Sequence, residues 1–542
     1  MAPPRQRPTG RTQDGDDHAD TGAASPPPTT PPSARPRLKT SKPPAAARPS
    51  PAAAAARRPL GSLVVGGVAV LLLALSLLAS QRWRHGAFRL GSHVPSVYER
   101  GLVTETPAVR AILQEHARTT WQRAAAPAAP EPSASGTATL VYVTPWNRRG
   151  SDVALRLAAR RRRRPLEAAD AHNATLLVAP TWFSVFSADA AQQRPEQDAR
   201  LRATDRWSAS RAYLATGFQD IDAGWVRTLQ TPPAPARVVP RVLLTLASHH
   251  DLARLTANRD GAADDLAQLL ATIVADHGFD GLVVEAPGCV VTFLNPLLAA
   301  LRKRLHAQLY GSTKLIVVVV PALAAGSEAT EDHEAALFIK PNEAAQAGAA
   351  LASVPADFFA VMTYDYMPPW AWTMPPGAGP AGGGHVSGGG MPNAPRAWVE
   401  ASLAHLLDDG QLAPSRVLLG MNLYGAAYPA LEPAIVFREP LVGAAYLDMI
   451  ARAPAGPLPP PPDASPDAAP ISAEDAAGRL IWDARAEEHV MLIARADGTP
   501  YAVWYPTLYS LAQRMARVRA WGVGVALWEI GQGLDYFYEI VG

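Results

Sequence analysis

The chain has 542 residues, with 53 prolines, 40 glycines and a single cysteine, and these numbers limit the classes of protein to which it can belong. Its formal net charge is only +2, from 50 basic and 48 acidic residues, so no overall field marks a nucleic-acid-binding protein. The lone Cys289 excludes an internal disulfide framework and a metal site built on several cysteines. Long apolar runs after residue 136 exclude a fibrous or wholly disordered chain.

The first 135 residues are expected to lie outside the folded domain. Residues 1–59 are rich in proline and arginine and contain no aromatic residue, which predicts a disordered tail. Residues 60–80 carry no charge, and as a helix they would span ~31 Å, close to the thickness of a bilayer core, so they predict one transmembrane helix. A buried core helix is the alternative for this segment. Residues 81–135 are expected to form a stalk or linker.

The predicted span makes a membrane the first expected partner. The tail before residue 60 carries more positive charge than the segment after residue 80, which favours a cytosolic N-terminus. We therefore expect a single-pass type II membrane protein whose folded part is lumenal or extracellular, in an endomembrane or lysosome-like compartment. Secretion after cleavage of the anchor is the alternative.

From residue 136 onward, eight apolar runs alternate with stretches of helical period. Continuous Val, Ile and Leu runs are typical of parallel strands that are covered on both faces. Four of the intervening stretches are clear helices, at 264–277, 293–309, 397–407 and 508–521. This alternation predicts a (β/α)8 TIM barrel at 136–542, with a doubly wound open sheet as the alternative. The runs are 139–147, 174–186, 237–246, 279–287, 314–323, 358–367, 417–425 and 523–531.

Three stretches interrupt this pattern. Residues 375–395 are rich in glycine and residues 451–478 in proline and alanine, and both are predicted to be flexible insertions. Arg160–Arg164 is a run of five arginines, which is expected to be a solvated helix end, with polyanion binding as the alternative.

Aromatic, amide and carboxylate side chains gather where the predicted strands end. In a barrel of this kind the functional residues come from these carboxyl ends. Rings can stack on sugar faces and polar groups can bind sugar hydroxyls, so the pattern indicates a carbohydrate site. No phosphate-binding loop, zinc-protease motif or serine-hydrolase motif occurs, the histidines are scattered, and no metal or cofactor is expected. The candidate ligand-binding residues are Trp146, Trp182, Asp280, Tyr364, Asp365, Tyr424 and Trp528, with Glu285 as the candidate catalytic residue.

Several of these segments resemble glycoside hydrolase family 18, the chitinase-like barrels. The similarity is carried by FDGLVVEAP (279–287), VMTYDY (361–366) and VGVALWEIGQGLDYFY (523–538), and it extends over roughly 95–542. The resemblance implies a small α+β insertion at 426–507, after strand seven. It also implies that Tyr364 and Asp365 contact an N-acetyl sugar and that Trp528 forms the floor of its site.

The family's catalytic motif, Asp-x-x-Asp-x-Asp-x-Glu, is degenerate in this chain. Its first position corresponds to Asp280, its third to Glu285 and its acidic Glu to Pro287, which cannot donate a proton. Glu285 would lie roughly 6.6 Å deeper along the strand than the missing acid, too far for direct proton transfer at that position.

The resemblance and the degenerate motif together imply a protein that binds N-acetylglucosamine-type oligosaccharides and is weakly active or inactive as a hydrolase. Two alternatives remain open. One is an active family 18 glycosidase that uses Glu285 or another carboxylate such as Asp365. The other is a protein-interaction module with a vestigial sugar cleft and a protein receptor as its partner.

Overall fold

The computed structural model describes most of the chain from residue 95 onward. The predicted tail (1–59) and span (60–80) lie outside the described residues, as do 119–135, 375–390 and 453–478. Within the described ranges, no helix is both long enough and apolar enough to cross a membrane. These ranges are 95–118, 138–163, 175–187, 207–210, 212–232, 236–245, 249–287, 289–307, 313–322, 347–366, 391–429, 439–452, 480–494 and 500–541.

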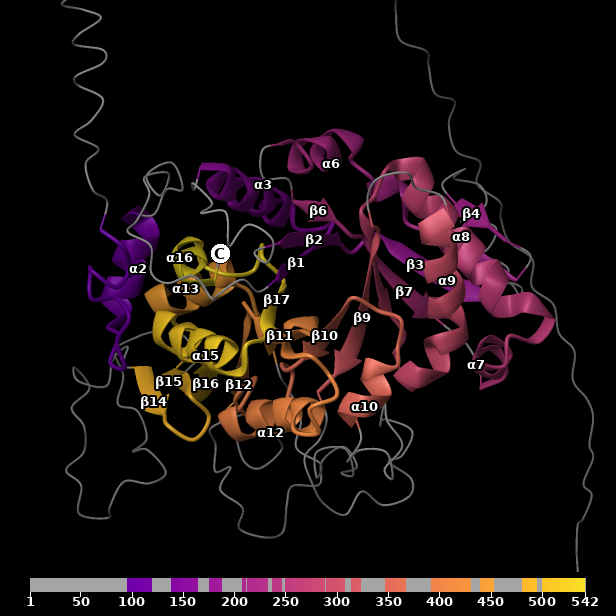
Figure 1. The fold of residues 1–542 in the computed structure, drawn as a ribbon. Helices are drawn as coiled ribbons and strands as arrows, with labels where there is room; N and C mark the ends of the chain where they lie inside the picture. The colour runs from indigo at the N-terminus through magenta and orange to yellow at the C-terminus, as the bar shows by residue number, and fades with distance from the viewer. Residues whose placement is uncertain are drawn as a thin grey trace, which may run out of the picture. The chain divides into compact units, whose positions relative to one another are not determined.

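A curled parallel sheet forms the centre of this unit, with helices around it (Figure 1). The first strand, β1 (Thr139–Val143), pairs in parallel with both β2 (Leu176–Pro180) and the last strand, β17 (Gly524–Trp528). The first and last strands of the predicted alternation are thus neighbours, and this curled parallel sheet confirms the predicted α/β barrel-like fold. The other parallel strands are β3 (Phe183–Ser187), β6 (Arg237–Val238), β7 (Arg241–Thr245), β8 (Gly281–Glu285), β9 (Leu315–Pro321), β10 (Phe358–Met362) and β11 (Val417–Asn422).

Two of the eight predicted strands are interrupted. The second consists of β2 and β3, and the third consists of β6 and β7, which run beside them. Val178 pairs with Val238, whereas Phe183 pairs with Val242, so the second strand holds one more residue than the third over this stretch. The extra residue makes a bulge around Trp182, which re-aims the side chains there.

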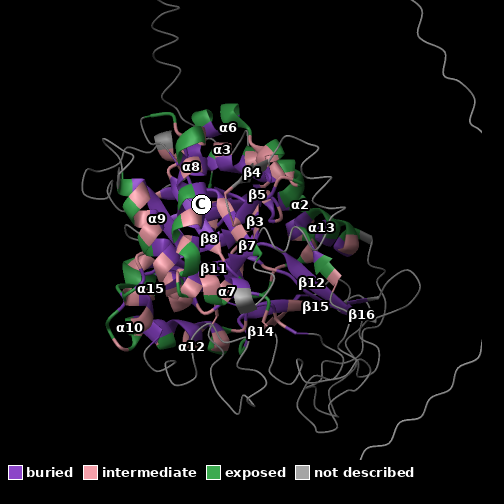
Figure 2. Cartoon of the chain, turned by 90° about the vertical axis from the view of Figure 1, so that its right-hand side faces the viewer, coloured by how far each residue is buried: buried purple, intermediate pink, exposed green. Residues whose placement is uncertain are grey.

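The strands are apolar throughout because both of their faces are covered. In β1, Leu140 and Tyr142 belong to the cluster inside the barrel, while Val141 and Val143 belong to the larger cluster under the helices. In β8, Val283 points inward and Val284 outward in the same way. The strands of the barrel are accordingly mostly buried, and many of the exposed residues lie on the helices, as Figure 2 shows.

Gly281 allows β8 to approach its neighbour closely. Its φ is +146°, and a Cβ atom there would lie 2.0 Å from the carbonyl oxygen of Leu315 on β9. Only glycine fits such a backbone conformation and such an approach.

Helices follow the strands around the barrel. The four helices predicted from the sequence are present as α8 (Ala262–His277), α9 (Asn295–Ala307), α12 (Arg396–Leu407) and α15 (Leu508–Trp521). The other helices of this layer are α3 (Arg148–Arg163), α6 (Ala223–Leu229), α7 (His249–Thr256), α10 (Ala347–Ala352) and α16 (Tyr538–Val541). The described part of the arginine run ends α3. There Arg160 donates to the carbonyl of Tyr538 (3.0 Å) and Arg161 to the hydroxyl of Thr139 (3.0 Å), so these two side chains also contact the barrel.

A second, antiparallel sheet lies between β11 and α15. Its five strands have the order β13-β12-β16-β15-β14, and α13 (Gly443–Arg452) accompanies them. These elements fall within the range predicted as an α+β insertion, whose limits as a domain stay a prediction. The strands are β12 (Gly425–Pro429), β13 (Glu439–Leu441), β14 (Leu480–Asp483), β15 (Glu488–Ala494) and β16 (Pro500–Trp504).

Part of the predicted stalk is packed onto the barrel unit instead. The described segment 95–118 contains α2 (Val109–Arg118), which contacts α13. Val97 is fully buried, and Arg100 forms ion pairs with Glu115 (2.9 Å) and with Glu539 of α16 (3.3 Å). The stalk prediction is therefore wrong for these residues, because their apolar side chains have a surface to bury against that the sequence does not reveal.

A short hairpin was also not predicted. Strands β4 (Trp207–Ala209) and β5 (Tyr213–Thr216) pair with each other, and β5 extends the sheet antiparallel to β3. Runs of three and four residues are too short to produce a recognisable alternation.

Candidate functional site

An ion pair stands at the carboxyl end of β8. Glu285 is the last residue of that strand, and one of its carboxylate oxygens contacts Nε of Arg241 on the neighbouring β7. Arg241 lies opposite Val283, whose side chain points into the barrel, so the arginine also originates inside the barrel. Both side chains are 16% exposed, so the pair is largely shielded from water.

The guanidinium of Arg241 also lies against an aromatic pair. Its central carbon is 5.7 Å from the ring centroid of Trp528, at the end of β17. The ring of Tyr142, from β1, is 5.0 Å from that of Trp528 and tilted by 59°. Burial alone would lower the pKa of Arg241, but the hydrogen bond and charge of Glu285 outweigh it and raise that pKa. The arginine is therefore a fixed positive charge.

The two buried tyrosines at this end of the barrel remain protonated. Burial raises the pKa of Tyr142, and the negative charge of Glu285 raises it further. Burial likewise raises the pKa of Tyr364 well above its ordinary value, with contributions from Tyr142, Tyr424, Glu285 and Asp365. Their hydroxyls can therefore donate hydrogen bonds at any physiological pH.

A second carboxylate follows β10. Asp365 accepts a hydrogen bond from the hydroxyl of Tyr424 at 2.5 Å. Its backbone has a φ of +62°, in the left-handed region, and its N–H donates to the side-chain oxygen of Asn393 at 2.8 Å. Asn422, at the end of β11, donates to the carbonyl of Tyr424 at 2.7 Å.

A third carboxylate, Glu529, is fully buried beside Trp528. It accepts hydrogen bonds from the amide of Asn147 (2.9 Å) and from the N–H of Gly531 (2.8 Å). Burial raises its pKa, and these hydrogen bonds oppose the shift. Because its oxygens are already bonded to the protein, Glu529 ties the loop after β1 to the end of β17.

A comparison with models of protein families assigns this barrel to a family. The model of glycosyl hydrolases family 18 matches residues 242–533, more than half of the chain. The chain belongs to glycosyl hydrolase family 18. The matched range includes Glu285, Asp365 and Trp528.

Solved chitinases and related enzymes are similar to this family 18 chain at low sequence identity. A chitinase from Chromobacterium violaceum is 18% identical, covers 75% of this chain and 98% of its own, and gives a TM-score of 0.47. The spore cortex-lytic enzyme SleL of Bacillus cereus gives 12% identity, coverages of 75% and 74%, and a TM-score of 0.46. A chitinase from Cycas revoluta, solved in complex with (GlcNAc)3, is 12% identical, covers 74% of this chain and 98% of its own, and gives a TM-score of 0.47. The family assignment rests on the matched family model and not on these alignments.

The structure brings together five of the eight site residues expected in this family 18 chain. Glu285, Tyr364, Asp365, Tyr424 and Trp528 form one group through the contacts and charge interactions described above. Their strands differ, but each lies at or just beyond a carboxyl end.

The other three lie elsewhere. Asp280 precedes β8, at the opposite end of that strand from Glu285, and accepts hydrogen bonds from Gln230 (2.7 Å) and from the N–H of Val238 (2.9 Å). Trp182 is 8% exposed and packs against Trp225 of α6, in the layer between barrel and helices. Trp146 is 74% exposed beyond the end of β1.

Sequence reasoning missed Tyr142, Arg241 and Asn393. Arg241 did leave a signal, since it is the single charge within the apolar stretch 238–245. A lone charge inside a strand that is buried on both faces requires a partner, which here is Glu285. Tyr142 and Asn393 left none, because their roles depend on contacts between distant segments.

Proposed function

We propose that this family 18 protein binds N-acetylglucosamine-type oligosaccharides at the carboxyl end of its barrel and hydrolyses them weakly or not at all. The observation that carries the proposal is the ion pair between Glu285 and Arg241, together with Pro287 at the position of the family's acid. An intact platform of aromatic and polar groups is thus combined with a missing proton donor.

Glu285 is poorly suited to replace that donor. A general acid must reach the glycosidic oxygen, whereas the carboxylate of Glu285 is engaged by Nε of Arg241 and lies roughly 6.6 Å deeper along the strand than the family's acid. Asp365 is also engaged, as the acceptor of the Tyr424 hydroxyl. Both carboxylates are better suited to accept hydrogen bonds from sugar hydroxyl or amide groups.

Binding is supported by the remaining groups of the cluster. Trp528 is only partly buried and offers apolar ring surface, with Tyr142 packed behind it, and Tyr364 and Tyr424 carry hydroxyls. Rings with a few convergent polar groups are typical of carbohydrate sites.

The finer assignments are also proposals. The motifs of this chain resemble those of chitinase domain-containing protein 1, and we place it in that subfamily. The apolar segment 60–80 supports a type II membrane anchor with a lumenal or extracellular barrel. A protein receptor remains the alternative partner.

Titration calorimetry with chitotetraose tests the binding. We expect saturable binding by the wild-type chain and affinity weakened about tenfold or more by Trp528→Ala, which removes ring surface equivalent to at least ~1.4 kcal/mol. Trp521→Ala is the matched control, because Trp521 ends α15 and is not part of the cluster. Absence of any saccharide binding by the wild type would contradict the proposal and favour the protein-receptor alternative.

A further inference from the structure

A buried ion pair connects the second sheet to the barrel helices. Glu488 begins β15 and Arg514 lies in α15, and their side chains are 10% and 8% exposed. The Arg514 guanidinium donates to Oε1 of Glu488 at 2.8 Å. A buried pair of this kind is stable only if its remaining hydrogen-bonding positions are also satisfied.

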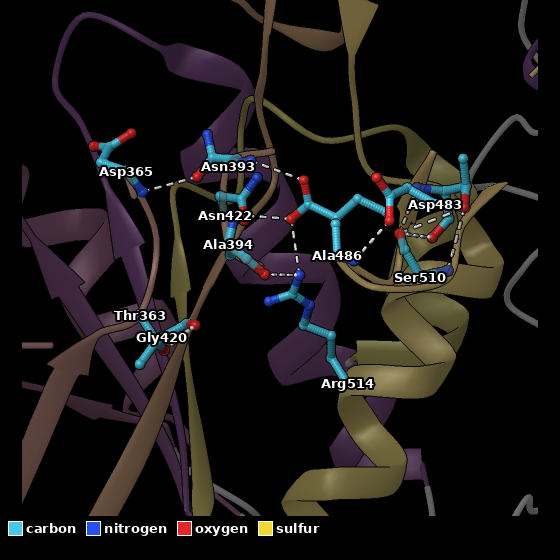
Figure 3. A network of polar contacts seen from close by, with 12 residues as sticks. Thr363, Asp365, Asn393, Ala394, Gly420, Asn422, Asp483, Ala486, Ser510 and Arg514 are labelled. Carbon is cyan, nitrogen blue, oxygen red and sulfur yellow. Dashed lines mark hydrogen bonds and ion pairs between the residues drawn. The ribbon is translucent and has the colours of Figure 1, made fainter. Parts of the chain in front are cut away.

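Those positions are satisfied by the segment 393–394. The N–H of Asn393 donates to Oε2 of Glu488 at 2.8 Å, and the N–H of Ala394 donates to Oε1 at 2.9 Å. Arg514 in turn donates to the carbonyl of Ala394. The ion pair therefore holds this dipeptide by both its N–H groups and one of its carbonyls, and Glu488, Arg514 and Asn393–Ala394 together form what we call the clamp (Figure 3).

Burial disfavours the charged form of both side chains of the clamp. It raises the pKa of Glu488 and lowers that of Arg514. The attraction between the two groups opposes both shifts, and the backbone N–H donors of Asn393 and Ala394 also oppose the shift of Glu488. Losing one member would leave the other charge buried and unpaired, so the clamp is a single unit.

Asn393 extends the clamp to the end of β10. Its side-chain oxygen accepts the N–H of Asp365 at 2.8 Å, and its backbone oxygen accepts the N–H of Tyr366 at 2.8 Å. Figure 3 shows Asn393 lying between Asp365 and Arg514. Asp365 has left-handed backbone geometry, which few residues adopt unless surrounding contacts hold them there.

The same contacts set the direction of the Asp365 carboxylate. That carboxylate accepts a hydrogen bond from the hydroxyl of Tyr424, and the amide of Asn422 donates to the backbone carbonyl of Tyr424. Two members of the candidate sugar site are thus oriented by a chain of hydrogen bonds that starts in the second sheet.

We propose that Asn393, held by Glu488 and Arg514, is a positioning residue that sets the geometry of Asp365 and Tyr424 for saccharide recognition. The inference rests on the proposed function, because it assigns the clamp a role in that same site. Asn393 contacts no ligand in this scheme and acts only through Asp365.

Asn393→Leu tests the role directly, since leucine is similar in size but offers no acceptor to Asp365. We expect its affinity for chitotetraose, measured by calorimetry, to fall about tenfold, the loss equivalent to one buried hydrogen bond. In an Asp365→Ala background the same substitution should change the affinity less than about twofold, because the residue that it positions is already gone. Equal losses in both backgrounds would overturn the proposal.

Two further measurements separate positioning from general destabilisation. Ser402→Ala in α12 removes the hydrogen bond of a buried side chain to the carbonyl of Trp398, outside the clamp, and should lower the melting temperature without changing the affinity. Amide hydrogen exchange of Asp365 and Tyr366 reports the clamp without any ligand. Asn393→Leu should release the amide of Asp365, and Glu488→Gln should release both amides. Unchanged protection in both variants would contradict the inference.

The outcomes distinguish the two proposals. If the wild type binds no saccharide but exchange at Asp365 responds to Asn393 and Glu488, the proposed function fails and the positioning by the clamp stands. If the wild type binds and Asn393→Leu binds equally well, the function stands and the positioning role fails.

Discussion

Arg241 is the residue on which the chemistry of the site depends most. It brings a permanent positive charge into the barrel, beside the only acidic residue of β8 and against the ring of Trp528. An arginine in such a place needs a partner, and so does the glutamate. Each side chain is therefore engaged by the other, and Glu285 acts in this pair as a hydrogen-bond acceptor.

This mutual dependence predicts an asymmetric response to mutation. Arg241→Met leaves the Glu285 charge largely buried and without its partner, and should lower the free energy of unfolding by about 2 kcal/mol. The double variant Arg241→Met/Glu285→Gln removes both charges and should recover most of that loss. Denaturant unfolding of the two variants and the wild type measures the difference. If the double variant is no more stable than Arg241→Met, the loss does not come from leaving the Glu285 charge without Arg241.

At the scale of single residues, the strand-end rule predicted part of the site and failed where side-chain direction changed. Tyr364, Asp365 and Trp528 lie where strand ends were expected to place them. Trp182 does not, because the bulge between β2 and β3 turns it under the helices. Asp280 occupies the amino end of its strand because the strand begins one residue later, at Gly281.

At the scale of elements, the eight parallel strands were predictable because each lies in a predominantly apolar run. The partner of each strand was less predictable. β1 and β17 pair in parallel although they are the first and last strands, and neither segment alone indicates this pairing. The packing of 95–118 was not predictable, since the surface that it covers comes from α13 and α16, far along the chain. The positions of α8, α9, α12 and α15 followed from their period.

His489 joins three of these elements. It lies on β15, and its Nε2 contacts the carbonyl of Glu105 in the N-terminal segment at 2.8 Å. Its Nδ1 contacts the hydroxyl of Thr507, the N-cap of α15, at 2.9 Å. The ring is fully buried against the rings of Trp482 and Tyr509. Both ring nitrogens therefore have neutral partners only.

Burial lowers the pKa of His489 below its ordinary value of 6.5. The unfolded chain then binds a proton at a higher pH than the folded chain does. The stability that neutral His489 contributes is therefore complete above about pH 6.5 and is lost as the pH falls through the lowered folded-state pKa.

His489→Gln keeps a polar group but cannot titrate. We expect the melting temperature of the wild type to fall more than that of this variant between pH 7.5 and pH 5. Circular dichroism melts of both proteins at each pH measure the difference. The neighbouring Glu488 is present in both proteins, so its titration cancels in the comparison. Parallel pH profiles would show that His489 does not contribute to the acid sensitivity.

At the scale of the whole molecule, one barrel unit accounts for the described residues from 95 onward, and the second sheet contacts the end of the barrel at which we propose the saccharide site. The clamp connects β15 and α15 to Asp365, so the site is not a property of the barrel strands alone. Sequence patterns predict strands and helices, but they do not show which buried charges from separate elements meet.

We propose that this family 18 barrel retains saccharide binding without efficient hydrolysis. Incubation of the purified chain with chitotetraose, followed by chromatographic detection of the shorter products, tests this proposal. We expect the wild type to form no more product than Glu285→Gln does, while calorimetry shows that both still bind. Clear turnover by the wild type that Glu285→Gln abolishes would contradict it, because Glu285 would then act as the acid despite its contact with Arg241.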